Sequence, residues 1–369
     1  MTDGPLAKSS NFRHVPREGV DRYRLVDPAR SVGPRRVAPV SAAGSVWLYA
    51  GAETPTLSVL DVETGACRSV TGVTAGDPTA DGPTPGGLTP GGPTRGAPTP
   101  WVDVESGAAH VLDGHTVTVY ETNESTQPAE PRSVGRFDAG TARSDPVAGL
   151  TRSADGEQFG TVFATDEGSV LATLSVEEGT TTVWHSRDRR YDTLRFSPSD
   201  ASLALLARDA TDGVGGEAWL AREGLGARPL ERLLPDHHRD LRWNDGGTGL
   251  WYVEPWRGVG LLHLEAARRE RVWATPAREA DATRGGDLLA ATVLAGPHRD
   301  GEPGRDGGSL RVAVYDRRED RERVVSDPIP ENAAWTPRPQ FVCDDRWLLY
   351  TATVDGASQV TLVPVEALR

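Results

Sequence analysis

The sequence predicts an all-β protein, and a recurring pattern is the main reason. An aromatic or equivalent residue and a serine-like residue precede an Asp or Gly turn and an apolar strand, at 150–163, 194–206, 241–253 and 340–350. The copies recur about every 40 to 60 residues, a period that fits one four-stranded unit. Such units bury their faces only by stacking on their neighbours. No long stretch of the sequence shows apolar residues at the spacing of a helix. We therefore predict a β-propeller, most simply of seven four-stranded blades.

The strand signals place these blades along the chain. Alternating β-branched, aromatic and small residues, as in 45–50, 56–61 and 116–120, are typical of half-buried strands. The expected blades are 36–73, 99–141, 142–186, 187–233, 234–276, 277–329 and 330–367, which makes 36–367 a single domain.

Residues 1–35 form an N-terminal arm in this prediction. The segment 22–26 has the composition of a strand, which could close the ring by pairing with the last blade. A loosely ordered arm is the alternative.

A Thr/Pro/Gly tract at 74–100 separates the first two blades. It has too little apolar surface to offset its ordering entropy, so we expect a flexible surface loop. A tether to a protein partner is the alternative.

The charge balance limits the class of partner. The chain has 53 acidic and 40 basic residues, a net charge of -13, and Lys8 is its sole lysine. An acidic surface argues against a nucleic-acid partner, because binding to phosphates needs a basic face. Acidic excess without lysine suits a halophilic protein, GC-rich codon usage would produce the same bias, and we expect both to act together.

The expected location is cytoplasmic. The N-terminus lacks a basic segment followed by an apolar core, and no apolar run reaches 18 residues, so we expect no membrane contact. Cys67 and Cys343 form no Cys-x-x-Cys motif, and we expect both to pack as small apolar residues.

Candidate ligand-binding residues come from the innermost strands, which line the central channel of a propeller. The position three residues before the aromatic residue of the pattern should face that channel. It holds Thr193 before Phe196, Asp240 before Trp243, and Arg338 before Phe341.

Three segments, 191–200, 251–260 and 358–365, resemble oligogalacturonate lyases and their TolB-like propeller relatives. The resemblance implies a carbon-oxygen lyase of pectin catabolism. It implies channel histidines and a glutamine that hold a divalent metal, a histidine base, and arginines that bind uronate carboxylates. A cation and a base suit this chemistry, because removing a proton beside a carboxylate builds negative charge.

This chain departs from the lyase pattern at each matched position. Thr193, Asp240 and Asp281 stand where the family has histidines, and 336–341 has Arg338 in place of a histidine-rich run. Threonine and arginine cannot replace imidazole as metal ligands, so we predict a degenerate site with no metal cofactor.

His238 is the remaining candidate for a catalytic base. It neighbours His237, and adjacent strand residues point to opposite faces, so at most one of the two should reach the channel. Solvated loop histidines are the alternative.

Arg190, Arg239 and Arg338 are candidates for binding carboxylates through bidentate guanidinium contacts. With Thr193, Asp240 and Asp281 they complete the predicted substrate-binding set. A salt-bridged surface is the alternative for the arginines.

Three functional hypotheses follow. The first is a propeller that binds an acidic oligosaccharide or another small anionic ligand. The second is a non-catalytic scaffold for a protein partner. The third is an active lyase with a relocated Mn²⁺ or Mg²⁺ site at Asp240, Asp281 and His238. No nucleophile elbow, Walker loop or dinucleotide fingerprint supports a hydrolase or a nucleotide-binding protein.

Overall fold

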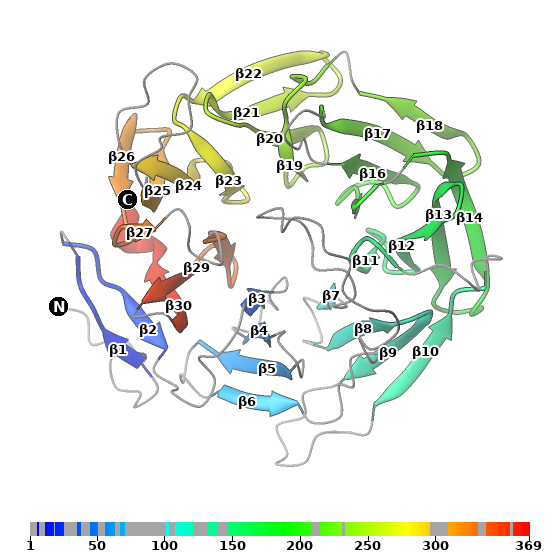
Figure 1. The fold of residues 1–369 in the computed structure, drawn as a ribbon, viewed down its shortest axis with the longest axis horizontal. Coiled ribbons are helices and arrows are strands. Elements are labelled where there is room, and N and C mark those ends of the chain that lie inside the picture. The colour runs from blue at the N-terminus through cyan, green and yellow to red at the C-terminus, as the bar shows by residue number, and fades with distance from the viewer. Residues whose placement is uncertain are drawn as a thin grey trace, which may run out of the picture.

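The structure is a computed structural model. It describes residues 6, 12–17, 19–25, 35–37, 45–50, 56–62, 67–70, 101–102, 108–120, 131–138, 146–189, 191–208, 215–230, 233–295, 309–330, 337–354 and 357–369. The strands of these residues form seven antiparallel sheets around a common centre (Figure 1). The predicted all-β propeller is confirmed.

The sheets follow one another in sequence order, each beginning with its innermost strand. The first four are β3 (Arg35–Val37), β4 (Ser45–Ala50), β5 (Thr56–Asp61), β6 (Cys67–Val70); β7 (Trp101–Val102), β8 (Ala109–Asp113), β9 (Thr116–Tyr120), β10 (Arg132–Arg136); β11 (Thr151–Arg152), β12 (Gln158–Thr165), β13 (Gly168–Ser175), β14 (Thr181–Arg187); and β15 (Thr193–Phe196), β16 (Leu203–Arg208), β17 (Glu217–Arg222), β18 (Gly226–Pro229). The last three are β19 (Arg239–Trp243), β20 (Gly249–Glu254), β21 (Gly258–His263), β22 (Arg268–Trp273); β23 (Ala277–Ala282), β24 (Leu288–Ala295), β25 (Ser309–Asp316), β26 (Arg321–Val324), with β27 (Ile329–Pro330) on β25; and β28 (Gln340–Val342), β29 (Trp347–Val354), β30 (Ala357–Pro364), followed by β2 (Tyr23–Leu25) and β1 (Phe12–His14).

The seventh blade joins the two ends of the chain. Its C-terminal part supplies β28, β29 and β30, and β2 pairs with β30 through Tyr23↔Leu362 and Arg24↔Thr361. β1 adds a fifth strand, and a 3-10 helix at Val365–Leu368 ends the chain. With β27 in the sixth blade, two sheets have five strands where the sequence predicted four.

The core lies between blades, as the stacking argument requires. Along β24, Leu288 and Ala290 pack in the cluster shared with the seventh blade, while Leu289 and Ala291 pack in the cluster shared with the fifth. This alternation is the period of two of a strand buried on both faces. Cys343 is a free, buried cysteine and lies in the cluster between the seventh and first blades.

Three predicted features fall outside the described part of the chain: the tract at 74–100, Arg190 and the side chain of Cys67. Within the described part, no helix has the length and apolar character needed to cross a membrane.

Candidate functional site

Strand register identifies equivalent channel positions in four blades. The residue at the aromatic position of each inner strand pairs with the second residue of the next strand, as Trp243 does with Leu250 and Ala282 with Leu289. The same holds in the fourth and seventh blades. Three residues earlier, the equivalent positions hold Thr193, Asp240, Glu279 and Arg338.

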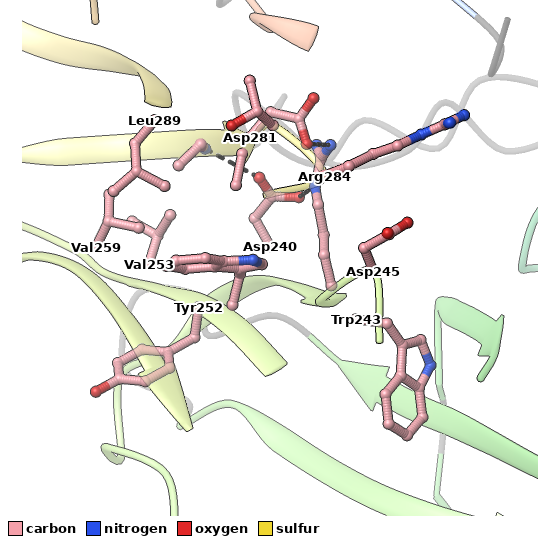
Figure 2. A pocket seen from close by; sticks show the side chains of 14 residues that line it. Asp240, Trp243, Asp245, Tyr252, Val253, Val259, Asp281, Arg284 and Leu289 are labelled. Atoms are coloured by element: carbon pink, nitrogen blue, oxygen red, sulfur yellow. Dashed lines mark hydrogen bonds and ion pairs between the residues drawn. The ribbon is translucent and has the colours of Figure 1, made fainter. Parts of the chain in front are cut away.

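Arg242 is the centre of a charged cluster on the channel wall. Its Nε donates to Asp240 Oδ1 at 3.0 Å, and its Nη1 donates to Asp281 Oδ1 at 3.0 Å. The side chains are 16%, 15% and 18% exposed, respectively, so the three charges are mostly removed from water. Figure 2 shows Asp240 and Asp281 turned toward each other across β19 and β23.

Each aspartate also binds the backbone of the next blade. The Ala280 N–H donates to Asp240 Oδ2 at 3.1 Å, and the Phe341 N–H donates to Asp281 Oδ2 at 2.8 Å. Asp240 adopts φ 50° where the pairing of β19 shifts between Arg239 and Arg242. Such a bulge redirects a side chain, here toward the sixth blade. The two carboxylates therefore hold the inner strands of three blades together.

Arg338 and Glu279 form a second, more open pair. Arg338 Nε lies 2.9 Å from Glu279 Oε2, and their side chains are 57% and 17% exposed. Burial raises the pKa of Glu279 to about 7, and Arg338 only partly offsets that shift. Near neutral pH, Glu279 therefore exchanges a proton while Arg338 remains charged.

The aspartates differ in their electrostatic surroundings. Burial alone would raise the pKa of Asp240, but Arg242, Arg338 and Arg195 lower it below its ordinary value. Burial raises the pKa of Asp281, and Arg242 counters that shift only in part. Three guanidinium groups thus surround Asp240 from β15, β19 and the segment before β28.

A cavity of about 150 Å³ lies beside this cluster, between the fifth and sixth blades. Asp240, Asp281 and Arg284 line its polar side, and Val253 and Leu289 line its apolar side (Figure 2). A small site with a few convergent polar groups on an apolar wall suits a small polar ligand or one unit of a longer one.

Two of the predicted binding residues, Asp240 and Asp281, share Arg242 and line the cavity. Arg338 pairs with Glu279 and lowers the pKa of Asp240, but it does not line that cavity. Thr193 occupies an equivalent channel position, but its Oγ1 donates to Asp192 at 3.1 Å. Arg239 pairs through its backbone with Val253, and no contact with the cluster is found among the described residues. Arg190 lies outside the described residues.

His238 does not join Asp240 and Asp281, in contrast to the relocated-site hypothesis. Its side chain is buried, with Nδ1 2.7 Å from the Pro235 carbonyl oxygen. Its ring lies against Gly216, where an added Cβ would come within 2.9 Å of Nε2. Burial lowers the pKa of His238 and so favours the neutral imidazole. The ring is turned toward the fourth blade.

The divalent metal implied by the lyase resemblance does not fit the residues at this site. Arg242 and backbone N–H groups occupy the carboxylate oxygens of Asp240 and Asp281, and Arg338 adds a further positive charge. No group of three or more potential ligands, counting His, Cys, Asp and Glu, is found in the described part of the chain.

Sequence reasoning missed Glu279 and Arg242. Ala282 occupies the aromatic position of the sixth blade, so the pattern gave no marker three residues ahead of it. Aligning the turn at 283–286 with the corresponding turns of the other blades would have identified Glu279 as the channel position of the sixth blade. Arg242 lies two residues after Asp240, but the bulge between Arg239 and Arg242 interrupts the period of two, so the strand pattern did not indicate that these side chains meet.

Solved structures with the same fold include two oligogalacturonate lyases. An oligogalacturonate lyase in complex with manganese is 14% identical, with a TM-score of 0.69 over 97% of each chain. An oligogalacturonate lyase from Vibrio parahaemolyticus is 12% identical, with a TM-score of 0.67 over 96% of this chain and 97% of that one.

A puromycin hydrolase matches less of its own length. It is 15% identical, with a TM-score of 0.60 over 92% of this chain and 53% of that one. No family model and no curated protein matches the sequence. At these identities the likeness establishes the fold, and the expected resemblance to lyase-like propellers is confirmed at that level.

Proposed function

We propose that the protein binds an acidic oligosaccharide, or another small anionic ligand, in its central channel through Arg338. The observation that carries the proposal is the Arg338 guanidinium, 57% exposed at the channel wall and paired with a carboxyl whose pKa is raised to about 7. A protonated Glu279 leaves Arg338 without an anionic partner on that carboxyl. A ligand carboxylate can then accept a bidentate contact from the guanidinium.

The same cluster supports binding without metal-assisted cleavage. Arg242 already neutralises Asp240 and Asp281, so these carboxylates are poorly placed to hold a cation or to act as a base. The proposal is therefore a lyase-like propeller that keeps a uronate-binding function. The second candidate function is a scaffold for a protein partner, which would not require ligand binding in the channel.

Calorimetric titration of trigalacturonate into wild type and Arg338→Ala tests this proposal. Loss of one charge-assisted contact is expected to cost about 1.5–3 kcal/mol of binding free energy. Arg318→Ala is the matched control, because Arg318 is 73% exposed and pairs with Asp287, outside the channel cluster. It should bind like wild type.

Each other outcome contradicts a defined part of the proposal. Equal affinities of wild type and Arg338→Ala would place the ligand away from Arg338. Absence of wild-type binding to any uronate would contradict the binding proposal and favour a scaffold for a protein partner. Accumulation of a 4,5-unsaturated uronate with added Mn²⁺ would identify an active lyase.

A further inference from the structure

A rim beside the channel mouth carries an exposed tryptophan. The turn between β20 and β21 contains Pro255 and Trp256, and the Trp256 side chain is 46% exposed. Leu225 and Val183 are the other exposed large apolar residues found in the described part of the chain. Trp256 is thus an unusual surface residue that the channel site does not explain.

The turn holds Trp256 in a backbone conformation that disfavours it. The Arg257 N–H donates to the Glu254 carbonyl at 3.0 Å, which closes a four-residue turn with Pro255 in its second position. Trp256, in the third position, has φ 68°, where a type II turn ordinarily has glycine. A non-glycine residue at positive φ is strained, and such strain clusters at functional sites.

Strand direction places Trp256 on the same rim as the channel mouth. Arg239, at the start of β19, pairs with Val253 near the end of β20, so the turn after Glu254 lies where the inner strands begin. β23 begins at that rim with Ala277, Arg278 and Glu279. The Arg278 guanidinium carbon lies 5.8 Å from the centroid of the Trp256 ring. Arg278 and Glu279 are adjacent in β23, so Trp256 lies near the inner strand that carries the partner of Arg338.

The surroundings of Trp256 are rich in positive charge. Arg257 and Arg271 both reach Glu254, at 3.1 Å and 3.8 Å, and Arg278 lies on the ring. This local balance contrasts with the chain's net charge of -13. An anionic ligand is favoured there, and the exposed indole offers a flat apolar face on which a sugar ring can pack.

We propose that Trp256 and Arg278 form an outer subsite for an acidic sugar unit beyond the second of a chain whose first unit is held by Arg338. The inference rests on the proposed function and extends it to the length of the ligand. The sugar ring packs on the exposed indole face, and its carboxylate pairs with Arg278.

Titration of digalacturonate and hexagalacturonate into wild type and Trp256→Ala tests the subsite. Wild type should bind the hexamer about tenfold more tightly than the dimer, the size expected for one aromatic contact with an adjoining ionic one. Trp256→Ala should lose that gain and keep its affinity for the dimer. Trp256→Tyr should keep most of the gain in affinity for the hexamer.

Two controls separate stacking from indirect effects. Leu225→Ala removes an exposed apolar side chain at the β17–β18 turn on the opposite rim, and it should keep the gain. Trp256→Gly relieves the positive φ, so it should unfold at a temperature at least as high as wild type and still lose the gain.

The outcomes distinguish this inference from the proposal on which it rests. A dimer that binds as tightly as the hexamer, or a gain that survives in Trp256→Ala, would overturn the outer subsite while leaving channel binding intact. No wild-type binding at either length would overturn both. An equal, Trp256-dependent gain with oligoglutamate would contradict the sugar assignment.

Discussion

Replacing Arg242 with methionine is expected to lower the free energy of unfolding by about 3–5 kcal/mol at pH 7. Methionine keeps most of the side-chain volume but leaves Asp240 and Asp281 facing each other without their shared cation. Both carboxylates are less than one-fifth exposed, so water replaces little of the lost interaction. Removing one partner from a buried charged network costs more than the network itself contributes.

Denaturant unfolding of Arg242→Met and of a control variant measures this effect. Arg222→Met removes an arginine whose ion pair with Asp200 is 43% and 34% exposed, and such pairs contribute up to about 1 kcal/mol. The loss in Arg242→Met should shrink in acid, as the unpaired aspartates take up protons. A loss no larger than that of the control would show that the cluster does not hold the three inner strands together.

Replacing Arg22 with methionine is expected to cost about 2–4 kcal/mol, the second largest effect. Arg22 is 3% exposed. Its Nε donates to the Val15 carbonyl at 2.9 Å, and its Nη1 donates to the Val325 carbonyl and Asp327 at 3.2 Å. These contacts fasten the segment before β2 to the sixth blade, so their loss weakens closure of the ring.

Thermal unfolding and limited proteolysis near the N-terminus provide the measurement. Arg13→Met is the control, because Arg13 lies in β1 with an exposed side chain. Arg22→Met should unfold at a lower temperature than the control and be cleaved sooner. Equal behaviour of the two variants would mean that the N-terminal strands contribute little to closure.

The blades were predictable because each strand is buried on both faces by its neighbours. In β20, Leu250 and Tyr252 pack toward the fourth blade while Trp251 and Val253 pack toward the sixth, and such apolar runs between turns stand out in a sequence. The seventh blade was less predictable. Its fourth strand lies far away in the chain. The composition of 22–26 indicated a strand that could pair with the last blade but left a loosely ordered arm open, and the pairing of β2 with β30 shows the strand.

The site was only partly predictable, because its geometry depends on register and on one bulge. The pattern pointed to Asp240 and Arg338 but not to Glu279, since Ala282 replaces the aromatic marker. It also favoured His238 as a base. Position along a strand does not show that the backbone shifts near Asp240, and His238 is turned toward Gly216 instead.

The central claim is that Arg338 binds an anion when Glu279 releases it, and the affinity for trigalacturonate at pH 6 and pH 8 tests this most directly. Because burial raises the pKa of Glu279 to about 7, its carboxyl is mostly protonated at pH 6 and mostly ionised at pH 8. Arg338 keeps its charge at both pH values. Calorimetry on wild type should therefore show several-fold tighter binding at pH 6, and Glu279→Gln should bind equally well at both. No binding at either pH, or wild-type affinity that is unchanged or higher at pH 8, would contradict the claim.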